Sequence, residues 1–259
     1  MFSARQLREI FHFCFLENLL RIADAKQFVL KGGVNLRFFF RSPRYSEDMD
    51  VDVLAGGVAT LKKNGYRVLG DPTFRRTLRT YGIADIAIND PDKARHTQTT
   101  QRFRVQLITA SGEKLPGKVE FSRRAGAGLA RVVEPIDPEV ARQYHRLGFL
   151  CQHYSGEAAA VQKVLALAGR SVTQARDVFD LDILLRGGHA HLPILEAVSA
   201  RDRAVACQNL ESLDFAAYSG QVLEFLDEEH RASYGNRPAW NAMVNRVREL
   251  LDSSGNSIS

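Results

Sequence analysis

The segment 46–54, SEDMDVDVL, alternates between acidic and apolar residues from Asp48 onward. Its apolar positions are Met49, Val51 and Val53, and its acidic positions are Asp48, Asp50 and Asp52. A period of two predicts a β-strand with one apolar face and one acidic face. Three carboxylates on one face repel one another. The acidic face therefore either lies in water, as a solvated edge strand, or is neutralised by something positive.

Carboxylates two residues apart on a strand project side by side, at a spacing that suits one or two hard divalent cations. Mg²⁺ favours one or two carboxylates, with water and substrate phosphates completing its octahedron. An EF-hand loop also begins D-x-D-x-D, but Val53 stands at its sixth position in place of Gly and Ala59 at its twelfth in place of Glu, so that site is excluded. The spacing therefore suits a divalent cation such as Mg²⁺, and the solvated edge strand stays the alternative.

Two glycines stand about fifteen residues before the acidic strand. Gly32 and Gly33 separate a short apolar strand, expected over 28–30, from a helical run over 34–40. Glycine lets the backbone approach a phosphate, and a helix N-terminus offers free N–H groups and a positive dipole. The combination predicts a phosphate cradle beside a metal site. Glu120, in KVEF, is a candidate third carboxylate from a neighbouring strand.

The order of patterns along the chain predicts an α+β fold, with an N-terminal mixed-sheet domain over 1–140 and a C-terminal helical domain over 141–259. A helix is expected over 4–23, and a further helical stretch follows the acidic strand and reaches about Thr80. Strands are expected over 85–89, 102–108 and 118–122, the last two joined by the turn-forming SGEKLPG. Strand patterns end near Pro138. Helices over 157–169 and 173–185 follow.

The formal net charge is +5 and unevenly distributed. Residues 190–259 hold ten acidic and six basic side chains, so the positive excess lies before them. Basic residues crowd two stretches, 26–44 and 93–104, the second with Lys93, Arg95, Arg102 and Arg104. This asymmetry fits a polyanionic partner such as a nucleotide, RNA or DNA. An ordinary solvated basic face explains it equally well.

Three cysteines, Cys14, Cys151 and Cys207, lie far apart without a CxxC pair. An odd, dispersed set argues against a disulfide framework and for a reducing compartment. No apolar run approaches the ~20 residues of a membrane span. We therefore expect a cytoplasmic protein without a membrane partner.

LKGGVNLRFFF followed by RYSEDMDVDV resembles the nucleotidyltransferase superfamily, whose pattern is a glycine turn, a D-x-D strand and a later carboxylate. Within it, the sequence most resembles the AbiEii/AbiGii toxin family, which includes the MenT tRNA-modifying toxins. Two further motifs of that family match QKVLALAGR, with Lys163, and ARDVFDL, with Arg176, Asp177 and Asp180. The resemblance covers residues 26–186. Val34-Asn35 departs from the common Thr-Ala.

The resemblance implies a role for each matched residue. Asp48 and Asp50 would ligate Mg²⁺ and align the α-phosphate of the nucleotide. Gly32 and Gly33 would cradle the triphosphate, with Ser46 near the phosphates. Lys163 would contact phosphate, and Asp177 would orient Lys163 or Arg176. Glu120 would act as general base or as an extra metal ligand.

Some of these side chains also have simpler interpretations. Lys163, in an Ala/Leu-rich helix, could extend from an apolar face to water. Asp177 and Asp180 could pair with Arg170 and Arg176. Lys31 and Arg44 flank the proposed site and are candidate phosphate ligands, or ordinary surface charges.

The implied function is that of a nucleotidyltransferase toxin. It would transfer nucleotides from an NTP to an acceptor, with the 3′ end of tRNA expected, in a Mg²⁺-dependent reaction that blocks translation. A cognate antitoxin would be its protein partner. Two alternatives stay open: the same chemistry on a protein hydroxyl or a small molecule, and a non-catalytic nucleotide- or RNA-binding module.

Overall fold

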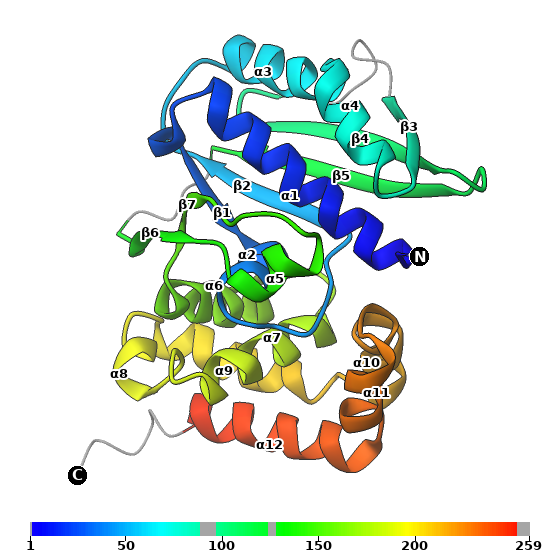
Figure 1. Ribbon diagram of the computed structural model, residues 1–259. Helices are drawn as coiled ribbons and strands as arrows, with labels where there is room; N and C mark the ends of the chain where they lie inside the picture. The colour runs from blue at the N-terminus through cyan, green and yellow to red at the C-terminus, as the bar shows by residue number, and fades with distance from the viewer. Residues whose placement is uncertain (1, 89–96, 124–127, 253–259) are drawn as a thin grey trace. The chain divides into compact units, whose positions relative to one another are not determined.

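The computed structural model describes residues 2–88, 97–123 and 128–252, and its contacts divide the chain into two units (Figure 1). The first unit comprises Met1–Phe39 and Tyr45–His153, and the second comprises Phe40–Arg44 and Tyr154–Ser259. These units are groups of contacting residues. The predicted division into domains over 1–140 and 141–259 stays a prediction.

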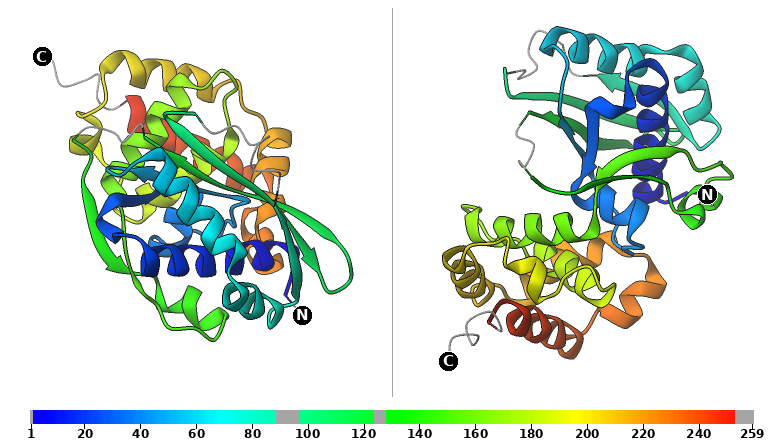
Figure 2. Two further views of the ribbon diagram at one scale, coloured as in Figure 1. Left: turned by 90° about the horizontal axis from the view of Figure 1, so that it is seen from above. Right: turned by 90° about the vertical axis from the view of Figure 1, so that its left-hand side faces the viewer.

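The first unit is built on a sheet with the strand order β3-β4-β5-β2-β1-β7-β6. The strands are β1 (Phe28–Lys31), β2 (Asp48–Val53), β3 (Ile83–Ile88), β4 (Thr100–Thr109), β5 (Lys114–Ser122), β6 (Arg131–Pro135) and β7 (Leu150–Tyr154). β2 pairs antiparallel with β1 and parallel with β5, and β4 pairs antiparallel with both β3 and β5. The sheet is therefore mixed, as predicted, and β4 and β5 form its long twisted ribbon (Figure 2).

Helices cover the apolar face of this sheet. They are α1 (Ala4–Ile22), α3 (Val58–Gly70) and α4 (Pro72–Arg79). Phe15 of α1 contacts the rings of Phe74 on α4 and Phe121 on β5, and Tyr66 of α3 contacts Phe103 on β4. Met49 and Val51 of β2 are fully buried on the same face. The alternation along β2 therefore sorts its apolar side chains into the core and leaves its carboxylates on the opposite face.

Shorter elements complete the first unit. These are the 3-10 helix η1 (Ala25–Gln27), the helix α2 (Gly32–Phe39) and the helix α5 (Pro138–Gln143). α2 follows β1 directly and begins at Gly32, two residues before the helical run expected from the sequence.

The second unit is helical. Its elements are α6 (Gly156–Gly169), α7 (Ala175–Arg186), α8 (Leu192–Leu195), α9 (Ala200–Leu210), α10 (Phe215–Gln221), the 3-10 helix η2 (Leu223–Phe225), α11 (Glu228–Tyr234) and α12 (Arg237–Asp252). α6 packs against α7 and α9, and α12 packs along α7 and α9 (Figure 1). The stacked rings of Tyr218 and Trp240 join α10 to α12. None of the helices in the described ranges has the length and apolar character needed to cross a bilayer.

The expectation that strands end near Pro138 was wrong, because β7 (Leu150–Tyr154) adds a strand in parallel pairing with β1. Its sequence, LCQHY, lacks alternation and contains no β-branched residue. Its buried polar residue, His153, places its ring Nδ1 2.9 Å from the Asn35 side-chain oxygen and stacks on Phe39. Tertiary contacts therefore select the strand where local sequence preference does not.

Candidate active site

The carboxylates of β2 meet charged side chains from the strands on both sides. The register places Asp50 opposite Lys31 of β1 and opposite Glu120 of β5, and Asp48 opposite Lys118 of β5. Because paired residues on neighbouring strands point to the same sheet face, three predicted catalytic residues, Asp48, Asp50 and Glu120, are brought together. β2 also lies inside the sheet, between β1 and β5, so the solvated edge-strand interpretation is wrong.

Basic side chains neutralise most of this acidic face. Lys118 Nζ lies 3.1 Å from Asp48 Oδ2 and 3.5 Å from Glu120 Oε2. Arg102 of β4 donates from Nε to Glu120 Oε2 at 2.7 Å. Lys31 is paired with the buried Asp52. The fold thus reduces the repulsion expected on this face by pairing Asp48 with a lysine of β5 and Asp52 with a lysine of β1.

Asp50 is the carboxylate on this face that no basic side chain pairs with directly among the described residues. Its carboxylate makes no hydrogen bond or ion pair with any residue in the described ranges, although its backbone is paired with β1 and β5. Burial raises the pKa of Asp50, and the nearby Glu120 and Asp48 charges add to this effect against the opposing influence of Lys118 and Lys31. Burial alone would also raise the pKa of Glu120, but the hydrogen bond from Arg102 and the charge of Lys118 hold that pKa below its usual value. A negative charge at Asp50 therefore lacks a direct partner, and a cation beside it would supply one.

The donor set fits Mg²⁺ bound together with a substrate. Among the described residues, no group of three or more His, Cys, Asp or Glu side chains forms a metal cluster by itself. Asp48 and Asp50 offer two carboxylates on one strand face, which is the sparse protein ligation that Mg²⁺ accepts when phosphates and water complete its shell. These two residues would hold the ion.

The glycine turn lies against the same carboxylate. Gly32 has a positive φ of 70°, which favours glycine. A Cβ added there would lie 3.2 Å from Asp50 Oδ2. Gly32 and Gly33 form the first turn of α2, so the N-terminus of this helix begins beside Asp50. Ser46 donates from Oγ to the Asp48 main-chain oxygen at 2.9 Å, which fixes the start of β2.

A second ionic cluster lies in the helical unit. Lys163 of α6 places Nζ 2.9 Å from Asp177 Oδ1 and 2.6 Å from Asp180 Oδ2, both on α7. Arg44 binds Asp180 through Nη2 at 2.8 Å, and Arg170 Nε lies 2.9 Å from Asp177 Oδ2. Both aspartates are fully buried. The extension of Lys163 to water is therefore ruled out, and the pairing of Asp177 with Arg170 is confirmed.

Mutual attraction keeps this cluster charged despite its burial. Burial would raise the pKa of Asp180, but Arg44 and then Lys163 outweigh it and lower that pKa to about 2. Burial would likewise lower the pKa of Lys163, but Asp177 and Asp180 raise it. With three cations and two carboxylates, the cluster carries excess positive charge.

The predicted site residues thus fall into two sets. The first unit holds Lys31, Gly32, Gly33, Ser46, Asp48, Asp50 and Glu120, and the second unit holds Arg44, Lys163 and Asp177. Arg44 is 4% exposed and binds Asp180. Sequence reasoning missed Lys118 and the pairing of Arg102 with Glu120. Lys118 stands two residues before Glu120, so the alternation of KVEF puts both on one strand face and could have found it.

Comparisons with known proteins agree with the motifs. A family model described as "Nucleotidyl transferase AbiEii toxin, Type IV TA system" matches residues 14–255. JHP933 from Helicobacter pylori has a similar structure over 99% of this chain and 97% of its own, with a TM-score of 0.54 and 20% identity. MenT4, a nucleotidyltransferase toxin from Mycobacterium tuberculosis, has a similar structure over 96% of this chain and 84% of its own, with a TM-score of 0.56 and 16% identity. A search of curated proteins finds no match. The predicted nucleotidyltransferase-like fold is confirmed.

Replacing Asp50 by Asn is expected to stabilise the protein, because it removes a partly buried charge without a direct partner. Thermal unfolding should show a higher Tm, corresponding to about 0.5–2 kcal/mol, the range typical of stabilising changes. Asp48→Asn is the matched control on the same strand. It loses the 3.1 Å ion pair with Lys118 and should give no increase. A Tm of Asp50→Asn below that of the wild type would contradict this account.

Replacing Lys163 by Met is expected to destabilise the protein by about 1.5–3 kcal/mol, the range for a lost hydrogen bond to a charged group, because each of two buried carboxylates loses one of its two cations. Urea unfolding measures this loss. Lys63→Met, at an exposed position of α3, is the control and should stay within about 0.5 kcal/mol of the wild type. The double variant Lys163→Met/Asp177→Asn should recover part of the loss. A Lys163→Met protein as stable as the wild type would refute the structural role of the cluster.

Proposed function

Because the chain belongs to the AbiEii family of nucleotidyl transferase toxins of type IV toxin–antitoxin systems, we propose that it transfers nucleotides from an NTP to the 3′ end of tRNA and so blocks translation. Family membership confirms the enzyme class, and it implies an NTP substrate and an antitoxin partner. The Mg²⁺ requirement, the tRNA acceptor and the effect on translation are parts of the proposal.

One observation carries the catalytic part of the proposal: Asp50, without a direct partner for its charge, lies against the glycine that opens α2. We assign Asp48 and Asp50 to hold Mg²⁺, and Gly32 and Gly33 to bind the triphosphate through the backbone. When bound, Mg²⁺ supplies neutralisation of phosphate charge. Ser46, through its bond to the Asp48 main chain, keeps the ligand strand in position.

Glu120 is assigned to the acceptor. In the reaction the acceptor hydroxyl oxygen bonds to the α-phosphorus, the bond from that phosphorus to the bridging oxygen breaks, and pyrophosphate leaves. The hydroxyl proton passes to Glu120. Arg102 and Lys118 hold the pKa of this carboxylate below its usual value against the effect of burial, and its oxygens are able to accept a hydrogen bond from the hydroxyl and orient it.

Lys163 is assigned as a phosphate ligand, following the family resemblance. Asp177 would orient it, and the 2.9 Å hydrogen bond from Lys163 to Asp177 supports that role. Arg44 and Lys31 remain proposed phosphate ligands, although each is engaged by an aspartate. The positive charge excess of the chain is compatible with a nucleic acid acceptor. NTPs and tRNA meet in the cytoplasm, where we place the activity.

Incubation with each radiolabelled NTP, Mg²⁺ and total tRNA tests the proposal. We expect the wild type to label tRNA, and Asp50→Asn to lower the rate at least ~100-fold, as for other losses of charge stabilisation. Asp85→Asn, an exposed carboxylate on β3, should retain the wild-type rate. Periodate oxidation of the tRNA 3′ diol should abolish labelling if the 3′ end is the acceptor.

Two outcomes would overturn the proposal. Label on protein or on a small molecule would favour the same chemistry with another acceptor. Tight binding of NTP or RNA without transfer, under any divalent metal, would favour a non-catalytic binding module.

A further inference from the structure

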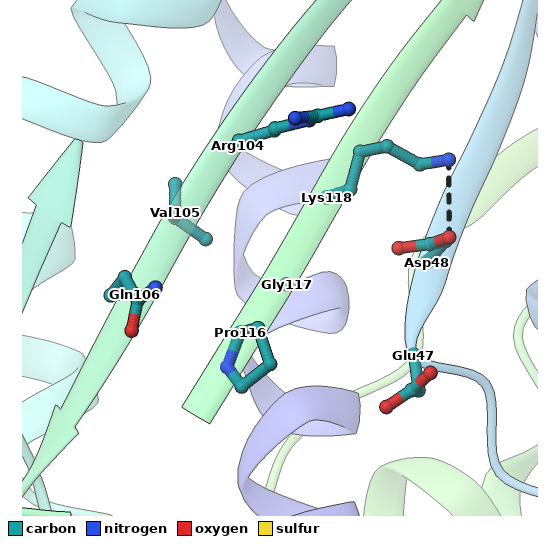
Figure 3. Close-up of a pocket in the computed structure, with 8 residues that line it drawn as sticks. All are labelled: Glu47, Asp48, Arg104, Val105, Gln106, Pro116, Gly117 and Lys118. Carbon is teal, nitrogen blue, oxygen red and sulfur yellow. Dashed lines mark ion pairs between the residues drawn. The ribbon is translucent and has the colours of Figure 1, made fainter. Parts of the chain in front are cut away.

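A groove lies on the polar face of the sheet, next to the carboxylate site and within the first unit. Its volume is about 420 Å³, and the residues that matter for its chemistry are Glu47, Asp48, Arg104, Gln106, Pro116 and Lys118 (Figure 3). Asp48 and Lys118 belong to both the groove and the carboxylate site. We call this feature the β4–β5 groove. Its volume lies in the range of pockets that take a small molecule or a nucleotide.

The groove contains a positive charge that the fold leaves without compensation. Arg104 of β4 lies directly opposite Lys118 of β5 in the strand register, and like charges at such positions repel. Lys118 turns to Asp48 and Glu120. Arg104 is exposed and has no hydrogen-bond or ion-pair partner among the described residues. In Figure 3 both side chains leave adjacent strands in the same direction. An anion between them would relieve the repulsion.

The strand order places the β4–β5 groove and the glycine turn on different sides of the carboxylates of β2. The order is β4-β5-β2-β1, so the glycine turn at the end of β1 and the β4–β5 groove lie on opposite sides of β2. In nucleotidyl transfer the attacking and leaving oxygens are roughly in line on opposite sides of the phosphorus. If the triphosphate lies on the β1 side of Asp48 and Asp50, the acceptor must come from the side of Glu120, Arg104 and Lys118.

We propose that the β4–β5 groove binds the phosphodiester backbone of the acceptor RNA just before its reactive 3′ end, with Arg104 as the phosphate ligand. This inference rests on the proposed function. An arginine fork suits a phosphate because it donates two parallel hydrogen bonds. The exposed Gln106 and Glu47 at the same groove offer polar groups to hydroxyls of the ribose.

The test is the effect of Arg104→Gln on both substrates. Steady-state kinetics should show the KM for tRNA raised about 10- to 100-fold, the loss expected for a hydrogen bond to a charged group, with the KM for NTP unchanged. Arg104→Lys should lie between Arg104→Gln and the wild type. Arg76→Gln, an exposed arginine on α4, is the matched control and should not change either KM.

Direct binding provides a readout that does not depend on catalysis. Fluorescence anisotropy with a short single-stranded RNA should show weaker binding by Arg104→Gln. The slope of log affinity against log salt should fall by about 0.7, as expected when one phosphate contact is lost from a single strand. Equal RNA affinity of Arg104→Gln and the wild type would overturn the inference. A raised KM for NTP alone would also overturn it, since the groove would then belong to the nucleotide.

The two proposals fail in different ways. If the wild type labels no RNA, the proposed function fails, and the binding measurement alone decides whether the groove holds RNA. If the wild type labels tRNA but Arg104→Gln has the wild-type KM for it, the function stands and the groove assignment fails.

Discussion

Repulsion between carboxylates on one face of β2 is the constraint on which the candidate site depends. The register of the sheet reduces this repulsion, because it brings Lys118 to Asp48 and Glu120 and Lys31 to Asp52. Asp50 receives no such partner, and its pKa is raised by burial. A fold selected only for stability would remove this charge, whereas functional sites retain such unfavourable groups. In the proposed function, a bound cation would supply the partner that Asp50 lacks.

The helical unit uses charge in a different way. Lys163, Arg44 and Arg170 surround Asp177 and Asp180, so each buried carboxylate has direct partners. Such a cluster holds α6 and α7 in one arrangement, and losing Lys163 leaves each buried carboxylate with a single cation. A catalytic defect in a Lys163 variant consequently needs a stability measurement beside it, since the residue is both a proposed ligand and a structural contact.

Local sequence patterns predicted many residues of the candidate site, but few of the side chains that contact them. The alternation around Asp48 and the paired glycines depend on neighbouring residues, so both could be found in the sequence. The pairing of Arg44 with Asp180 joins residues 136 apart, and no periodicity reports it. β7 was not predicted, because its residues form a strand through pairing with β1 and the burial of His153 rather than through a local sequence pattern. The charge balance of Glu120 depends on register across β4 and β5, which the sequence does not specify.

We propose that Asp48 and Asp50 form the site at which a metal and a nucleotide bind together. Isothermal titration with each of the four α,β-methylene NTP analogues, in which the bond to be broken is blocked, measures this directly. The account predicts nucleotide binding that is at least ~10-fold tighter with Mg²⁺ than without it, a gain that Asp50→Asn loses. Equal affinity with and without Mg²⁺ for every analogue, or an unchanged Mg²⁺ effect in Asp50→Asn, would contradict it.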